Sequence, residues 1–287
     1  MPAKAQAKTR GKRGSKTKET TGVLNVAFVW DMSGSMGTVH EATRQGTYDY
    51  LNDLLAEEAK LVEKEGEGVY TRFSLTAFDT VFERWLINEP IAGINPSEIV
   101  SKYWPRGGTA LYDAIAHTIT EIEAQLKAEE REEEKVLVIV MTDGQENSSQ
   151  DYALRDNGRQ RLMELIQSYE AKGNWTFVYL GANVDAYAEA SSIGIAPGNT
   201  ASYSPTAGST YAVMGGVSNI TMERRSSMRG QTVSAFADAG VTSDYRDNAN
   251  DTSVADNSSL WTPSGTVDAD SPYLWTPEKK KRSKRSR

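Results

Sequence analysis

The sequence contains no cysteine and only two histidines, His40 and His117, among its 287 residues. Without cysteine there is no disulfide, no thiolate nucleophile, no zinc ribbon and no iron–sulfur cluster. A zinc site with three histidine ligands is likewise excluded. These absences remove the commonest soft-metal and redox chemistries at once.

Long apolar runs are also missing. No run approaches the length that spans a bilayer, and no apolar segment follows the basic N-terminus as it would in a signal peptide. The sequence lacks G-x-S-x-G, G-x-x-x-x-G-K-[ST] and G-x-G-x-x-G as well. We therefore expect a cytoplasmic protein that is not an enzyme and does not contact a membrane.

Charge is distributed unevenly along the chain, although the net charge is only -7. Residues 1–20 and residues 278–287 each carry seven Lys or Arg and one acid, so 18 of the 32 bases and 37 of the 39 acids lie between them. An acidic body attracts cations, whereas basic ends attract anionic surfaces. Residues 1–21 show no apolar periodicity and are predicted to be a disordered basic tail.

Strand-like and helix-like segments alternate after residue 22. The runs 23–30 and 136–142 are almost continuously apolar, which is typical of parallel strands buried on both faces. Further strands are predicted at 69–79 and 81–87, as an antiparallel pair, and at 174–183. Helices are predicted at about 39–65, after Pro96, after residue 111, and at about 159–171, 184–194 and 210–227. This order predicts an α/β fold: a doubly wound, mostly parallel central sheet with helices on both faces and one antiparallel edge strand.

Oxygen-bearing side chains follow the predicted strands. Asp31 and Asp143 end the two apolar runs, Ser33 and Ser35 lie in the turn after the first, and Thr109 lies in R-G-G-T. The carboxyl ends of parallel strands meet at one edge of the sheet, where such folds bind ligands. All five side chains are hard oxygen donors, which suit Mg²⁺, Mn²⁺ or Ca²⁺. The sequence thus predicts a divalent metal site.

The ordered set D-x-S-G-S, G-G-T and T-D-G resembles the von Willebrand factor type A domain, over residues 22–229. In that family these elements form a metal-ion-dependent adhesion site. The resemblance implies that Asp31, Ser33, Ser35, Thr109 and Asp143 hold Mg²⁺, or Mn²⁺ or Ca²⁺, and that the metal captures a carboxylate from a partner protein. Residues 181–216 are similar to type A domains of bacteria and phages, which favours a bacterial or phage source.

Other functions stay open at this stage. The metal could serve stability alone. Ser33 or Ser35 could be a nucleophile with His40 or His117 as base in a metal-dependent hydrolase, although their spacing resembles no known triad. The basic ends could make the chain a nucleic-acid-associated or scaffolding protein, whose binding would fall steeply with salt.

Residues 230–287 are predicted to be a largely disordered tail with a basic C-terminus. The tail repeats Leu-Trp-Thr-Pro, at 260–263 and 274–277. Two such aromatic anchors could engage two partner sites and gain from effective concentration. They could equally fold back onto the domain.

Overall fold

A computed structural model describes residues 22–182 and 185–227 of the protein. The strands in these ranges form one six-stranded sheet with the order β3-β2-β1-β4-β5-β6. Neighbouring strands are parallel except for β2 and β3, which are antiparallel at one edge. The predicted α/β fold class is confirmed. The strands are β1 (Leu24–Asp31), β2 (Thr71–Phe78), β3 (Phe82–Pro90), β4 (Lys135–Thr142), β5 (Trp175–Ala182) and β6 (Thr200–Tyr203).

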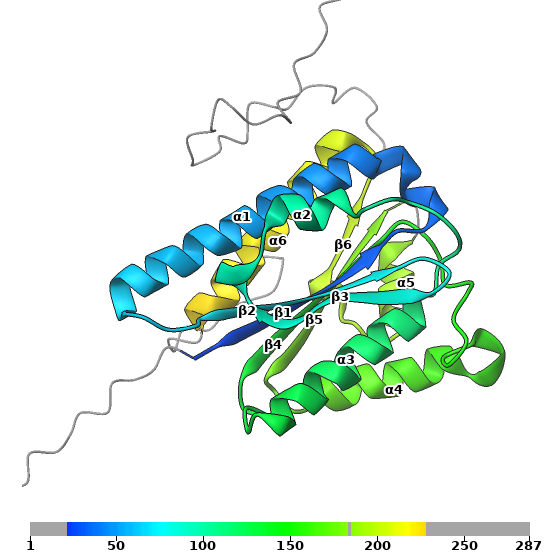
Figure 1. Ribbon diagram of the computed structural model, residues 1–287. Helices are drawn as coiled ribbons and strands as arrows, with labels where there is room; N and C mark the ends of the chain where they lie inside the picture. Colours follow the sequence, from blue (N-terminus) through cyan, green and yellow to red (C-terminus); the bar gives the residue numbers. More distant parts are fainter. Residues whose placement is uncertain (1–21, 183–184, 228–287) are drawn as a thin grey trace, which may run out of the picture.

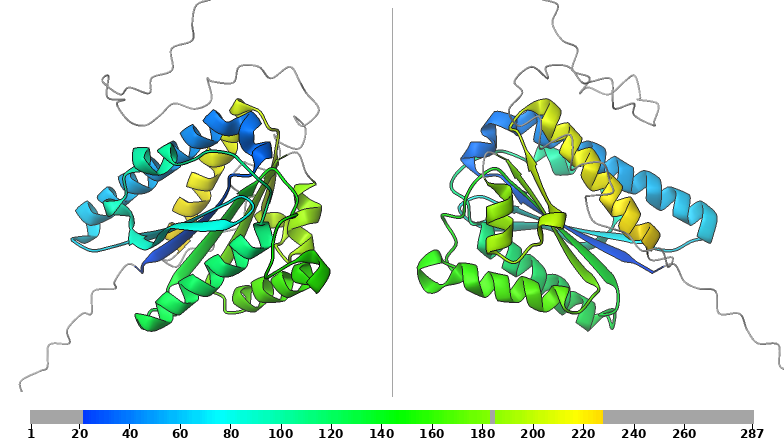
Figure 2. Two further views of the ribbon diagram at one scale, coloured as in Figure 1. Left: turned by 45° about the vertical axis from the view of Figure 1, so that its right-hand side comes forward. Right: turned by 180° about the vertical axis from the view of Figure 1, so that it is seen from behind.

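Helices cover both faces of the sheet (Figures 1 and 2). One layer contains α1 (His40–Glu65), α2 (Pro96–Ser101) and α6 (Ala207–Ser227). The other contains α3 (Leu111–Ala128), α4 (Gly158–Glu170) and α5 (Ala186–Ser192). Short 3-10 turns are η1 (Gly34–Val39), η2 (Ile91–Gly93), η3 (Leu154–Asp156) and η4 (Pro197–Asn199).

The central strand β1 divides the core in two. All eight of its residues are buried, because helices cover it on both sides. Phe28 and Trp30 belong to the cluster that α1, α2 and α6 complete. Ala27 and Val29 belong to the cluster that α3, α4 and α5 complete. The continuous apolar run at 23–30 is therefore the signature of a doubly covered strand.

Two features of the sheet differ from the prediction. The edge strand β6 was not predicted: it has four residues, T-A-S-Y, and pairs only with β5. A segment so short and polar shows neither an apolar run nor a clear alternation. β1 ends at Asp31, opposite Phe78 of β2, one residue beyond the predicted strand 23–30.

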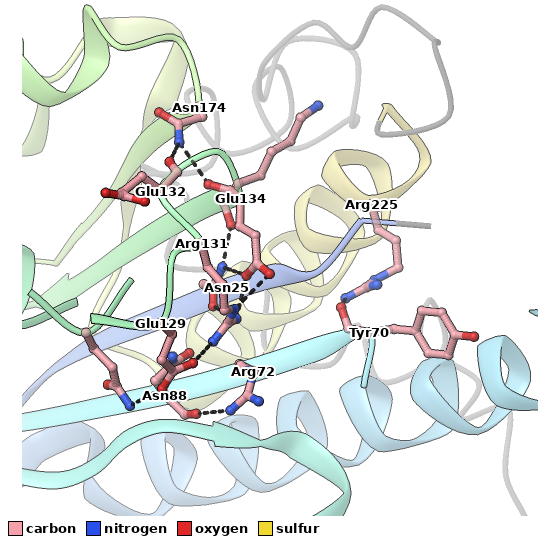
Figure 3. A network of polar contacts seen from close by, with 12 residues as sticks. Asn25, Tyr70, Arg72, Asn88, Glu129, Arg131, Glu132, Glu134, Asn174 and Arg225 are labelled. Carbon is pink, nitrogen blue, oxygen red and sulfur yellow. Dashed lines mark hydrogen bonds and ion pairs between the residues drawn. The ribbon is translucent and has the colours of Figure 1, made fainter. Parts of the chain in front are cut away.

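The two ends of the sheet have different polar structures. At the carboxyl ends of the strands, the Arg106 N–H donates to the Met32 carbonyl at 2.7 Å and the Gly34 N–H donates to the Gly107 carbonyl at 3.2 Å. These bonds join the loop after β1 to the loop before α3. At the opposite end, Figure 3 shows a network of arginine, glutamate and asparagine side chains around Arg131.

Several predictions lie outside the described residues. They are the disordered tails at 1–21 and 230–287, their basic clusters and both copies of Leu-Trp-Thr-Pro. The domain limits 22–229 also stay a prediction. Within the described part, no helix is both long enough and apolar enough to cross a lipid bilayer.

Candidate metal centre

Asp31 is fully buried at the carboxyl end of β1. Its Oδ1 accepts the Ser33 N–H at 2.6 Å, and its Oδ2 accepts the Thr142 hydroxyl of the neighbouring β4 at 2.5 Å. Burial raises the pKa of Asp31 to about 6, against the lowering effect of these hydrogen bonds. The carboxylate is thus held firmly between two strands, at a place that disfavours its negative charge.

Ser33, Ser35 and Asp143 form a chain of contacts beside Asp31. The two serine Oγ atoms are 3.1 Å apart, and Ser35 Oγ donates to Asp143 Oδ1 at 2.6 Å. The other carboxylate oxygen, Asp143 Oδ2, is buried and accepts no hydrogen bond from any described residue. Burial also raises the pKa of Asp143, in opposition to the bond from Ser35.

Thr109 reaches the same place from the loop before α3. A Cβ atom built on Gly144 would lie 3.2 Å from Thr109 Oγ1 and 3.5 Å from Ser35 Oγ, so both hydroxyls surround the glycine that follows Asp143. The Thr109 side chain is only 3% exposed. The Thr109 N–H donates to Asn147 Oδ1 at 2.9 Å. The structure therefore brings all five predicted residues together at the carboxyl edge of the sheet.

The charges of Asp31 and Asp143 are uncompensated within the described residues. No Lys, Arg or His side chain there forms an ion pair with Asp31 or Asp143, and their hydrogen-bond donors are hydroxyls and one amide. The described residues also contain no group of three or more His, Cys, Asp or Glu side chains placed to hold a metal ion. The cluster is of another kind, with two carboxylates and three hydroxyls. Such all-oxygen donors fit a hard cation such as Mg²⁺, Mn²⁺ or Ca²⁺.

Sequence reasoning missed three residues that shape this edge. Thr142, the Thr of T-D-G, binds Asp31 through its hydroxyl. Glu146 and Asn147 lie in the loop after Gly144 and bind the segment that contains Thr109. The signal was the polar run Q-E-N-S-S directly after T-D-G, because acidic and amide side chains in such a position often bind backbone N–H groups.

No family model matches the sequence, and no curated protein matches it. Solved structures are similar in fold. The PilB minor pilin of Streptococcus sanguinis, in two structures, is 13% identical, with TM-scores of 0.50 and 0.53. The match covers 71% and 74% of this chain and 62% and 64% of the pilin. At this identity the likeness shows the α/β fold alone.

Two further structures resemble the chain more weakly. A von Willebrand factor type A structure from Catenulispora acidiphila is 16% identical, with a TM-score of 0.46 and coverage of 71% of this chain and 43% of that one. A mussel byssus protein, proximal thread matrix protein 1, is described with a zinc-occupied metal-ion-dependent adhesion site. It is 18% identical, with a TM-score of 0.47 and coverage of 70% and 46%. This chain thus spans less than half the length of either.

Proposed function

We propose that this protein is a divalent-metal-dependent protein-binding module of the von Willebrand factor type A kind. Asp31, Ser33, Ser35, Thr109 and Asp143 would hold Mg²⁺, or Mn²⁺ or Ca²⁺. A bound ion would supply a cationic position that accepts a carboxylate oxygen from an acidic side chain of a partner protein.

Asp143 Oδ2 is the observation that carries the proposal. A buried carboxylate oxygen without a hydrogen bond is costly, and native proteins rarely tolerate it. This oxygen lies on the same carboxylate that Ser35 binds through Oδ1, beside the hydroxyl cluster. A cation would satisfy it, whereas the described residues offer it no donor.

The donor set favours a further anionic ligand. Only Asp31 and Asp143 contribute negative charge, and the three hydroxyls are neutral donors. An ion held in this way stays electrophilic enough to attract the carboxylate of a partner. The role of this chain's residues is to hold the two carboxylates and the three hydroxyls in place before the ion binds.

The environment of both histidines supports binding over catalysis. His40 Nε2 contacts the Tyr103 carbonyl at 3.1 Å. His117 Nε2 contacts Asp151 Oδ2 at 2.8 Å, and its ring is stacked on Phe82. Each imidazole is thus engaged away from the serines, which bond to one another and to Asp143. A non-enzymatic role, a cytoplasmic location and a bacterial or phage source stay predictions from the sequence.

Thr109→Val tests the proposal because valine keeps the shape of threonine and removes its hydroxyl. We expect wild-type protein to bind Mg²⁺ and Mn²⁺ in calorimetry and to capture a partner from host lysate only without EDTA. Thr109→Val should weaken metal binding by roughly tenfold or more and lose the EDTA-sensitive capture. Its melting temperature in EDTA should equal that of the wild type.

Two results would count against the function. One is wild-type protein that shows no heat of binding with either metal. The other is metal binding together with capture that is indifferent to EDTA and to Thr109→Val, which would leave the metal a purely structural role.

A further inference from the structure

The loop after Asp143 is bonded to Thr109 in both directions. The Thr109 N–H donates to Asn147 Oδ1 at 2.9 Å. The Thr109 carbonyl in turn accepts the N–H groups of Asn147, at 3.0 Å, and Ser148, at 3.2 Å. The segment that follows Asp143, another residue of the metal site, therefore binds both backbone polar groups of Thr109.

Glu146 extends this attachment to the start of α3. Its side chain is buried, with 7% exposure, and its Oε2 accepts the Tyr112 N–H at 2.9 Å. Its Oε1 accepts the N–H groups of Ser148 and Ser149, at 2.8 and 2.7 Å. A carboxylate at the first turn of a helix satisfies N–H groups that have no partner inside the helix.

Asp113 makes the reciprocal contact from α3. Its Oδ2 accepts the Gln150 N–H at 2.6 Å, and its Oδ1 accepts the Tyr152 N–H at 2.7 Å. A loop carboxylate, Glu146, therefore accepts a backbone N–H of the helix, and a helix carboxylate, Asp113, accepts backbone N–H groups of the loop. Hydrogen bonds thus join the segment 109–113 to the segment 146–152 along its length.

Close packing leaves Thr109 little room to shift. A Cβ on the preceding residue, Gly108, would lie 2.2 Å from Ser148 Oγ and 2.8 Å from Asn147 Oδ1. A larger residue there would have to displace the Ser148 and Asn147 side chains. Asn147 Oδ1 also accepts the Ser148 hydroxyl at 2.6 Å.

We infer that Asn147 is a positioning residue of the metal site: its side-chain oxygen holds Thr109 so that the threonine hydroxyl lies beside Gly144, the residue that follows Asp143. The inference rests on the proposed function. Asn147 is not one of the metal ligands, because its Oδ1 is occupied by the Thr109 N–H and the Ser148 hydroxyl. It acts through Thr109, in the way that outer residues orient the ligands of metal sites.

The first experiment compares Mn²⁺ affinities by calorimetry. Asn147→Ala should weaken binding by about tenfold. Asn147→Asp keeps an acceptor oxygen at the same place and should restore at least wild-type affinity. Ser148→Ala keeps the Asn147–Thr109 bond and is the matched control, with an expected change below about twofold.

A double-mutant cycle separates positioning from a general structural effect. In the Thr109→Val background the ligand hydroxyl is already absent, so adding Asn147→Ala should weaken Mn²⁺ binding no further. Additive losses would show that Asn147 does not act through Thr109, and would overturn the inference.

A readout without metal completes the test. In EDTA, hydrogen exchange of the Thr109 amide should be faster in Asn147→Ala than in wild type, and unchanged in Ser148→Ala. If Asn147→Ala fails to fold, Asn147→Ser, whose side chain is shorter, replaces it.

Equal Mn²⁺ affinity or equal exchange in wild type and Asn147→Ala would overturn the inference and leave the proposed function intact. No Mn²⁺ binding by wild type would overturn both.

Discussion

Glu134 at the amino edge of the sheet has different partners from Asp31 and Asp143 at the carboxyl edge. At the amino edge, Arg131 Nε donates to Glu134 Oε1 at 2.8 Å, and Glu134 Oε2 accepts Asn25 Nδ2 at 2.9 Å (Figure 3). At the carboxyl edge, the hydroxyls of Ser35 and Thr142 and the backbone N–H of Ser33 donate hydrogen bonds to Asp31 and Asp143. Glu134 thus has a base as partner, whereas Asp31 and Asp143 have none among the described residues, although Asp79 at the same edge pairs with Arg106.

The pKa values follow the same division. Hydrogen bonding to Arg131 lowers the pKa of Glu129 at the amino edge. Burial raises the pKa of Asp31 to about 6 at the carboxyl edge, because no neighbouring base offsets it. A buried acid that lacks a base is a cost in the metal-free fold, so its presence points to binding more than to stability.

Asp143→Asn, at the carboxyl edge, should produce the largest effect. The amide keeps an oxygen for the Ser35 hydroxyl and places an NH₂ group where the unpartnered Oδ2 now lies. We expect Mg²⁺ and Mn²⁺ affinity to fall by more than about 100-fold, since one of two anionic ligands is lost. In EDTA the variant should be at least as stable as wild type, because a buried charge is removed.

Glu134→Gln is the matched control at the amino edge. It also removes one negative charge from a carboxylate with an occupied oxygen, and it should leave metal affinity unchanged. If Asp143→Asn titrates like wild type in calorimetry, or if both variants lose metal binding equally, the two edges do not differ in the way described.

Arg131→Ala should have the second-largest effect, on stability alone. The Arg131 and Glu134 side chains are only 16% and 19% exposed, so removing the base leaves a partly buried acid uncompensated. We expect the free energy of unfolding to fall by about 2 kcal/mol, below the range for fully buried pairs. Urea unfolding in EDTA measures the loss, and Mg²⁺ affinity should not change.

Arg131→Lys refines that test. Lysine keeps the charge but cannot donate in a planar fork to two acids, so its loss should be smaller than that of alanine. Equal stability of all three proteins would mean that the Arg131 network does not stabilise the fold.

The sequence predicted the fold because the central strands carry their own signal. β1 and β4 are almost continuously apolar, since helices cover both faces, and their ends could be located within about one residue. β6 was missed because an edge strand of four residues carries almost no pattern. The antiparallel pair β2 and β3 was predicted from two strand-like runs with a tight turn between them.

The candidate site was predictable for a related reason. Its five residues occur in three short motifs. Two of these motifs lie at strand ends and the third is a glycine loop, and the topology brings all three to one edge of the sheet. Thr142 and Asn147 bind partners that lie 111 and 38 residues away in sequence, and the polar run Q-E-N-S-S does not identify those partners. The Asn25–Glu134 contact at the amino edge, across 109 residues, was hidden in the same way.

Glu123→Gln should have the smallest effect, and that effect should depend on pH. Glu123 lies on α3, where burial alone would raise its pKa, but hydrogen bonds from Lys172, Tyr169 and Lys127 outweigh burial and lower the pKa from 4.5 to about 2. Because the folded pKa is depressed, the stabilisation is present above pH 4.5 and is lost as pH falls toward 2. Solvent screens this partly exposed group, so Glu123→Gln should lower the free energy of unfolding by about 1 kcal/mol at pH 7. The difference from wild type should shrink steadily below pH 4.5, in urea unfolding followed by circular dichroism.

Glu164→Gln, at an exposed position on α4, is the control. A difference between wild type and Glu123→Gln that stays constant from pH 7 to pH 2.5 would show that side-chain packing, and not charge compensation, is what Glu123 contributes.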